Sequence, residues 1–504
     1  MGSFQPTTEQ AVAVHKASNM SADETLLITA FAGAAKTTTL ELIAQSLPQR
    51  RFLYLAFNKA IVEEAKKRFP KNVTIKTTHS LAYQYTAVDK KLRHSNYRAA
   101  EIAEMFHIEY KVAEHVLSVF DFFCNSAVES FGQIAVDTSI TDLAESLYTG
   151  MREGRHEITH SYYLKEFQLK LVSGLKVRQN FDYCLLDEAQ DTNPVTLSIF
   201  NHLSGKKIKV GDRHQAIYGF RGAINAMGGN NPKAVPGTIR MNLTTTFRCK
   251  PHIVDHANWI LETLKGEQAK IVSGNKTQAN ITTQACITRT NSAMIEFIDD
   301  LDNFNLTRSP DLIFDCLMSL LNWKYGLVSN ISKPFKFLTM FNSMGAINEY
   351  VELTDDQELK QGLKLLEKYD NETWADSGFR NGDKIRQLYQ KACDNHLRNG
   401  QSLTTLTTAH SAKGLEFDKV VLGEDFPDMV QVMAKLIQKN IIAKPEDFLK
   451  GQKQELVSAR EEANLYYVAV TRAKYELQDN TPNASLYETK MPLERIFALA
   501  RQTV

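Results

Sequence analysis

The sequence predicts an α/β protein built on two parallel β-sheets with helices on both faces. Short, fully apolar segments alternate with helical stretches, which is typical of strands buried on both sides of a parallel sheet. The predicted strands of the first sheet are Leu26–Ala30, Phe52–Ala56, Val73–Thr77, Tyr183–Leu186, Ile208–Val210 and Thr238–Leu243. Two later segments, Ile281–Thr288 and Val420–Leu422, predict the second sheet.

Two charged helical stretches interrupt these alternating regions, and 504 residues are too many for one hydrophobic core. We therefore expect two α/β domains, each with a mainly helical insertion. The expected boundaries are 1–82 and 178–250 for the first domain, 83–177 for its insertion, 251–303 and 400–504 for the second domain, and 304–399 for the second insertion.

The composition restricts the classes of protein that fit. There are 59 basic and 58 acidic residues, so the net charge of the protein does not attract nucleic acid. Any surface that binds nucleic acid must come from basic side chains placed locally. The six cysteines contain no C-x-x-C pair, which argues against an iron–sulfur cluster, a zinc site or a disulfide framework. Met1–Asn19 lacks an apolar signal core, and no apolar run is long enough to span a bilayer. We expect a soluble intracellular protein without a membrane partner.

A candidate phosphate-binding loop, Ala30–Thr37 (AFAGAAKT), lies between the first predicted strand and a helix. In such a loop backbone N–H groups cradle phosphate, Lys36 reaches the β- and γ-phosphates, and Thr37 ligates Mg²⁺. The strict pattern has glycine at the positions of Ala30 and Ala35, and Ala35, directly before the lysine, is the departure that matters. Taken alone, the segment fits an ordinary small-residue turn equally well.

An acidic pair, Asp187 and Glu188, follows the predicted strand Tyr183–Leu186. The first carboxylate is placed to bind Mg²⁺ and the second to orient or deprotonate water. The alternative interpretation is the solvated acidic start of a helix.

The string Val210–Ala223 (VGDRHQAIYGFRGA) follows no general structural rule and resembles motif III of the UvrD/Rep helicases of superfamily 1. Further resemblances occur in the order expected of that family and cover almost the whole chain. They are Thr8–Gln10 (the glutamine motif), Leu55–Ala60 (Ia), Thr77–Ser80 (Ib), Leu243–Cys249 (IV), Ile287–Asn291 (the strand after it), Thr408–Phe417 (V) and Tyr467–Lys474 (VI).

Within that group the resemblance is strongest to the F-box DNA helicases, through AFNKA, TTHSLA and Phe337–Lys368. The glutamine motif starts almost at residue 1, so we expect no F-box here and infer no ubiquitin-ligase adaptor role.

The resemblance implies two RecA-like motor domains of the P-loop NTPase class, with ATP bound between them and Mg²⁺ beside it. It implies an ATP-dependent DNA helicase that moves 3′ to 5′ on single-stranded DNA in DNA repair or recombination. Whether such a motor unwinds duplex or displaces bound proteins stays open. The expected partners are single-stranded DNA, duplex/single-strand junctions, and recombinase filaments or other DNA-bound proteins. We expect a monomer, in the cytoplasm or nucleoid of a prokaryote or phage, or in a eukaryotic nucleus.

The resemblance also assigns roles at the nucleotide. Glu188 is the expected catalytic base, Gln215 the γ-phosphate sensor, and Arg248 and Arg472 the arginine fingers. The expected nucleotide-binding residues are Gln10, Gly33, Ala34, Ala35, Lys36, Thr37, Thr38, Phe247 and Glu416, and the expected Mg²⁺ ligands are Thr37 and Asp187. Gln10 would recognise adenine and Phe247 would stack on it, although such residues are commonly helix caps or core residues.

A single-strand path is implied in the same way, by aromatic groups that stack on any base and polar groups that hold phosphate. The expected residues are Phe57, Asn58, His79, Tyr218, Phe220, Arg221 and His410. Phe220 stands where many relatives have tryptophan, so grip there would be weaker. Phe57 and Phe220 would alternatively be core aromatics.

Three rival interpretations remain. The first is an ATPase-weakened or inactive helicase-like DNA-binding protein, because Ala35 adds a Cβ where the backbone approaches phosphate. The second, a 5′ to 3′ helicase, is disfavoured by the strings DEAQD and IYGFRGA. The third, a nuclease–helicase fusion, is disfavoured because the chain has no spare length for a nuclease domain.

Overall fold

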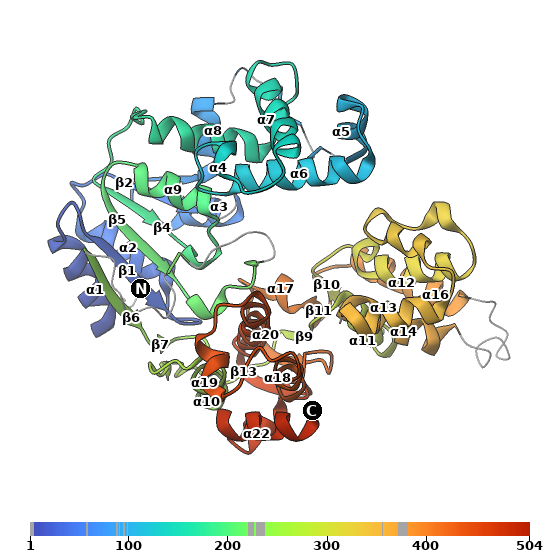
Figure 1. Cartoon of the computed structure of the whole chain (residues 1–504). Helices are drawn as coiled ribbons and strands as arrows, with labels where there is room; N and C mark the ends of the chain where they lie inside the picture. The colour runs from blue at the N-terminus through green and yellow to red at the C-terminus, as the bar shows by residue number, and fades with distance from the viewer. Residues whose placement is uncertain are drawn as a thin grey trace. The chain divides into compact units, whose positions relative to one another are not determined.

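The computed structural model of the chain describes residues 5–56, 59–86, 89, 91–93, 96–97, 99–219, 226–227, 237–354, 356–370 and 382–504. They form two compact units, Met1–Thr244 (unit 1) and Thr245–Val504 (unit 2). Figure 1 shows the elements of each unit along the chain.

The described part of unit 1 contains a parallel sheet with the strand order β3-β2-β4-β5-β1-β6. Its strands are β1 (Thr25–Ala30), β2 (Phe52–Ala56), β3 (Val73–Thr77), β4 (Tyr183–Leu186), β5 (Lys206–Gly211) and β6 (Thr238–Leu243). Because β5 pairs with both β1 and β4, the segments that follow these three strands emerge at the same edge of the sheet.

Helices cover both faces of this sheet, which explains why its strands are apolar on both sides. Leu26 and Ile28 of β1 belong to one buried cluster, whereas Leu27 between them belongs to the cluster on the opposite face. The helices of unit 1 are α1 (Thr8–Asn19), α2 (Lys36–Ser46), α3 (Lys59–Arg68), α4 (Thr78–Thr86), α5 (Ala99–Phe106), α6 (Tyr110–Asn125), α7 (Thr138–Arg152), α8 (His160–Val172) and α9 (Pro194–His202). Helices α5 to α8 form the helical part drawn in cyan and teal in Figure 1.

Unit 2 contains a second parallel sheet, with the strand order β10-β11-β9-β12-β13. Its strands are β9 (Gln284–Thr288), β10 (Asn305–Leu306), β11 (Thr404–Thr408), β12 (Phe417–Leu422) and β13 (Ala473–Asp479), and β7 (Thr245–Thr246) pairs separately with β8 (Val272–Ser273). The fold class predicted from the sequence is therefore confirmed: both sheets are parallel and accompanied by helices.

The helices of unit 2 fall into two groups along the chain. Those that alternate with the strands are α10 (Pro251–Trp259), α11 (Asn291–Asp300), α17 (Ala409–Ala412), α18 (Met429–Gln438), α19 (Pro445–Lys450), α20 (Gln454–Val470), α21 (Ala484–Glu488) and α22 (Leu493–Thr503). Those between β10 and β11 are α12 (Pro310–Lys324), α13 (Met344–Thr354), α14 (Gln357–Tyr369) and α16 (Asp383–Leu397), and they share one buried cluster with α11. Within the described ranges, no helix has the length and apolarity needed to cross a membrane.

Candidate nucleotide-binding and DNA-binding site

A lysine–carboxylate pair joins two strand ends of the first sheet. Lys36 is the first residue of α2, after β1, and Glu188 follows β4. The Lys36 Nζ lies 2.8 Å from both Oε1 and Oε2 of Glu188, and the Lys36 side chain is only 15% exposed. Burial opposes the charge on Lys36, but Glu188, Asp187 and Asp212 outweigh it and raise the pKa of the lysine. Lys36 therefore stays protonated in a partly closed site.

Asp187 is held by donors on both carboxylate oxygens. Its Oδ2 accepts hydrogen bonds from the hydroxyls of Tyr54 (2.6 Å) and Thr37 (3.3 Å), and its Oδ1 accepts one from the Glu188 N–H (2.8 Å). Burial, followed by the nearby Glu188 charge, raises the pKa of Asp187. A carboxylate beside a threonine hydroxyl gives oxygen donors of the type that Mg²⁺ uses together with phosphate and water. The residues present therefore fit this ion.

Gln190 connects the acidic pair to the segment after β5. Its Nε2 donates to Glu188 Oε2 (2.6 Å), and its Oε1 accepts from the Asp212 N–H (3.1 Å). Asp212 Oδ2 in turn accepts from Gln215 Nε2 (2.7 Å). Only glycine fits at Gly211 without a shift, because a Cβ there would lie 2.3 Å from Gln190 Oε1. A continuous chain of contacts thus runs from Lys36 to Gln215.

Two residues of the site have left-handed backbone conformations. Ala35 caps α2 with φ 56° and ψ 46°, and Glu188 has φ 49° and ψ 42°. A non-glycine residue in this region costs roughly 1–2 kcal/mol. The sequence argument that the position before the lysine favours glycine therefore has a structural basis in Ala35.

Gln10 and Thr38 make internal contacts. Gln10 is 1% exposed and forms a capping box with Thr7 at the start of α1. Its Nε2 also donates to Thr39 Oγ1 (3.3 Å), which donates to the Ala35 carbonyl (3.0 Å). Thr38 Oγ1 accepts from Arg68 Nη2 (2.8 Å). Gln10 therefore contacts α2, the helix that follows the candidate phosphate-binding loop. Its contact with adenine stays a prediction.

Two of the predicted residues of unit 2, Arg248 and Glu416, form an ion pair. Arg248 Nε donates to Glu416 Oε2 (3.0 Å), and Arg248 Nη1 donates to the Thr471 carbonyl (3.2 Å). Lys474 Nζ lies 3.2 Å from Glu416 Oε1. Burial tends to raise the pKa of Glu416, but the two cations prevail and lower it. Arg248 and Glu416 are therefore partners within unit 2.

Arg472 is 1% exposed, and its guanidinium donates inside unit 2. Nε donates to the Val468 carbonyl (2.9 Å) and Nη1 to the Leu415 carbonyl (3.2 Å). Phe247, in contrast, is 44% exposed, so it is not the core aromatic that a lone phenylalanine usually is. The finger role of Arg472 and the stacking role of Phe247 stay predictions.

An aromatic cluster surrounds His79 near the start of α4. The His79 and Tyr83 rings both meet Tyr163 edge to face, at centroid distances of 5.9 Å and 5.8 Å. His160 Nδ1 lies 2.9 Å from the Tyr163 hydroxyl. Desolvation and the neighbouring His160 lower the pKa of His79 to about 4, so its ring is neutral at physiological pH. His79 and Tyr83 are exposed to solvent, whereas Tyr163, which contacts both rings, is buried.

The other predicted DNA contacts are placed as follows. Tyr218 follows β5 and is half-buried, and His410 is half-buried on α17 in unit 2. Four predicted residues lie outside the described ranges: Phe57, Asn58, Phe220 and Arg221.

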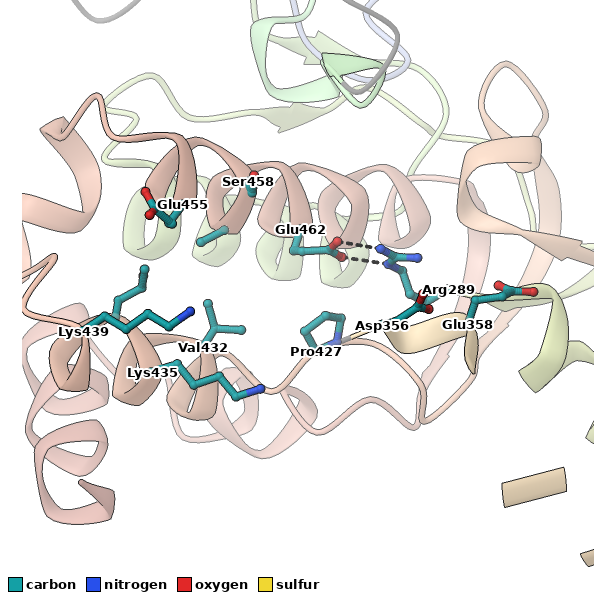
Figure 2. A pocket seen from close by; sticks show the side chains of 12 residues that line it. Arg289, Asp356, Glu358, Pro427, Val432, Lys435, Lys439, Glu455, Ser458 and Glu462 are labelled. Carbon is teal, nitrogen blue, oxygen red and sulfur yellow. Dashed lines mark hydrogen bonds and ion pairs between the residues drawn. The ribbon is translucent and has the colours of Figure 1, made fainter. Parts of the chain in front are cut away.

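Unit 2 also contains a pocket of about 450 Å³ beside Arg289. Figure 2 shows Arg289 bound to Glu462 of α20 by two hydrogen bonds, of 3.0 and 2.8 Å. Lys435 of α18 and Lys439, directly after that helix, line it together with further carboxylates. Because cations and carboxylates line the same pocket, its charges are largely compensated, and Arg289 serves to hold β9 against α20.

Sequence patterns assigned no role to Tyr54, Gln190 or Asp212. Gln190 and Asp212 lie inside strings that resemble helicase motifs, so their position was a usable signal. Tyr54 carries no such signal, because an aromatic residue in an apolar strand looks like any core residue.

Two segments of the chain match known protein families. The sequence profile of the UvrD/REP helicase N-terminal domain matches residues 161–228, and that of the UvrD-like helicase C-terminal domain matches residues 339–478. The fold and the strand-end residues define a P-loop NTPase of RecA-like architecture. Within that class, the two matched segments are similar to the N-terminal and C-terminal domains of UvrD/Rep-like helicases.

Several individual proteins are similar to this chain. It is 29% identical over 507 residues to F-box DNA helicase 1 of Gallus gallus, with 89% of this chain and 46% of the relative covered. It is 28% identical over 548 residues to F-box DNA helicase protein 1 of Schizosaccharomyces pombe, with 97% and 59% covered. A probable DNA helicase II homolog of Mycoplasma capricolum is 32% identical over 126 residues, which are 23% of this chain and 17% of the relative. The chain spans about half the length of the first two relatives.

The conformation of Ala35 predicts that Ala35→Gly stabilises unit 1. Glycine removes the left-handed strain but adds unfolded-state entropy, so we expect a net gain of up to about 1 kcal/mol in the free energy of unfolding. Chemical denaturation measures it. Ala34→Gly is the matched control, because Ala34 does not have a positive φ and should lose stability. A loss of stability in both variants would contradict the strain argument.

Proposed function

We propose that the chain is an ATP-dependent DNA helicase or translocase that moves 3′ to 5′ along single-stranded DNA. The observation that carries the proposal is the joined set Lys36–Glu188 and Thr37–Asp187 at the ends of β1 and β4. Together they supply a cation for phosphate, a hydroxyl and carboxylate for Mg²⁺, and a second carboxylate for water. Two similar proteins are named DNA helicases, which supports DNA as the substrate.

The residues suggest an order of events. ATP phosphate would take Lys36 from Glu188, because both anions compete for one ammonium group. Glu188, released from Lys36 but still bonded to Gln190, would then orient the attacking water. Mg²⁺, held by Thr37 and Asp187, would neutralise charge on the phosphates. Gln215, linked to Gln190 through Asp212, would sense the γ-phosphate.

The aromatic cluster on α4 supports a sequence-independent DNA contact. His79 is neutral and accessible, and Tyr83 beside it is 36% exposed. Flat, uncharged rings of this kind stack on any base, as a motor that moves along DNA requires. Unwinding of duplex and displacement of DNA-bound proteins, recombinase filaments among them, are both compatible with such a grip.

A second candidate is a helicase-like DNA-binding protein with weakened ATP hydrolysis. The specific observation in its favour is the left-handed Ala35, whose methyl group lies in the phosphate loop. Misplacing a reacting group by about 1 Å can cost on the order of a hundredfold in rate. Ala35→Gly should then raise ATP turnover by about tenfold, which corresponds to roughly 1.4 kcal/mol of barrier. Equal ATP turnover in the unchanged protein and in Ala35→Gly would rule out this second candidate.

The proposed function predicts that single-stranded DNA strongly stimulates ATP hydrolysis, because DNA contacts and catalytic residues share the same motifs. Steady-state turnover measured with and without DNA tests it. Glu188→Gln should abolish turnover without weakening nucleotide binding, since the ligands of the phosphates remain and Lys36 no longer has to leave an ion pair. DNA-independent turnover, or full turnover in Glu188→Gln, would contradict the assignment.

The DNA grip is tested by His79→Ala and Tyr83→Ala. Each should weaken binding to single strands of every sequence alike, by roughly 1–3 kcal/mol per stacked base. Fluorescence anisotropy with oligonucleotides of different sequence measures the effect, and affinity should also fall with salt. His202→Ala, an exposed histidine on α9, is the control. Unchanged affinity in both test variants, or a loss confined to one sequence, would rule out stacking at this cluster.

A further inference from the structure

Tyr54 is a fully buried tyrosine whose hydroxyl donates a hydrogen bond to Asp187, a carboxylate of the proposed nucleotide site. It is 0% exposed in the middle of β2, and its OH donates to Asp187 Oδ2 at 2.6 Å. Asp187 is 133 residues away along the chain. The contact exists because β2 pairs with β4, which places Tyr54 opposite Leu185, two residues before Asp187.

Packing fixes the ring of Tyr54 as well as its hydroxyl. Tyr54 lies on the face of the sheet that shares a buried cluster with α2 and α3. Its ring meets Phe69 at a centroid distance of 4.8 Å. A rigid ring with an immobile hydroxyl is suited to hold one carboxylate orientation.

The Tyr54 hydrogen bond is the shorter of two that reach Asp187 Oδ2. Thr37 Oγ1 donates to the same oxygen at 3.3 Å, and the Glu188 N–H occupies Oδ1. Without the Tyr54 hydroxyl, Oδ2 keeps only the long bond from Thr37. The carboxylate would then be free to turn away from the threonine with which it is proposed to bind Mg²⁺.

We propose that Tyr54 is a positioning residue that holds the Asp187 carboxylate against Thr37, so that the two bind Mg²⁺ beside the nucleotide phosphates. This inference rests on the proposed nucleotide site, because it assigns Asp187 to Mg²⁺. Tyr54 acts through Asp187 alone. Residues that orient a metal-binding carboxylate typically change metal affinity by about 10- to 100-fold when they are removed.

A purely structural role for Tyr54 predicts something different, and Tyr183 offers the matched control. Tyr183 lies in β4 of the same sheet and is 2% exposed. Its hydroxyl donates to the Ala17 carbonyl at 3.0 Å, and its ring stacks on Phe52 at 4.8 Å. Tyr54→Phe and Tyr183→Phe therefore each remove one hydroxyl and one buried hydrogen bond, but only the first bond involves Asp187.

The experiment measures ADP affinity by calorimetry, with Mg²⁺ and with EDTA, in the unchanged chain and in both variants. We expect Tyr54→Phe to keep the Mg²⁺-free affinity and to lose about 10- to 100-fold of the affinity gained from Mg²⁺. Tyr183→Phe should keep both. If Tyr54→Phe does not fold, Tyr54→4-aminophenylalanine, which retains a donor at the same place, should fold and keep the Mg²⁺ gain.

Three outcomes would overturn the proposal: a full Mg²⁺ gain in Tyr54→Phe, an equal loss in Tyr183→Phe, or no Mg²⁺ gain in the unchanged chain. Turnover stimulated by DNA is measured separately and does not enter this comparison. If the Mg²⁺ gain in ADP affinity depends on Tyr54 but DNA-stimulated turnover is absent, the proposed motor would be disproved and the positioning role would remain.

Discussion

The ion pair between Lys36 and Glu188 is the interaction on which the arrangement of unit 1 depends. Two opposite charges at a partly closed site are stabilised by pairing, since an isolated buried charge would cost several kcal/mol. The parallel sheet supplies the pairing, because β1 and β4 both end at the edge where β5 ends between them. Gln190 and Asp212 then extend the network to Gln215. A phosphate group that attracts Lys36 would therefore affect every residue of this hydrogen-bonded network.

Backbone strain lies on both sides of this ion pair. Ala35 precedes the lysine and Glu188 carries the carboxylate, and both have positive φ. Such conformations persist only where the surroundings determine them, and they are frequent at functional sites. Here Ala35 directly precedes the first residue of α2, Lys36, and Glu188 carries the carboxylate that contacts this lysine. Glycine would adopt the backbone conformation of Ala35 without strain, so alanine at this position makes the folded loop more strained than glycine would.

Much of the fold could be predicted because strands buried on both faces are continuous apolar runs. Among the strands of the second sheet, β11 and β13 were not predicted. Strand β11 has the sequence TTLTT, whose threonines are polar, and β13 lies at a sheet edge and carries charged residues. At the site, Lys36 and Asp187 were predictable because short-range patterns surround them. Tyr54 was not, since only the sheet pairing brings it to Asp187. The motif around Arg472 was also visible, whereas its burial against main-chain carbonyls depends on tertiary packing.

In the proposed function, Glu188 and nucleotide phosphate compete for Lys36. The most direct test is the affinity for a non-hydrolysable ATP analogue in the unchanged chain and in Glu188→Gln, with Asp191→Asn as the control for a lost carboxylate in the same segment. If Glu188 and phosphate compete for Lys36, Glu188→Gln binds the analogue severalfold more tightly, because Lys36 no longer has to leave an ion pair, and Asp191→Asn does not. Equal or weaker binding by Glu188→Gln, or the same gain in Asp191→Asn, would contradict it.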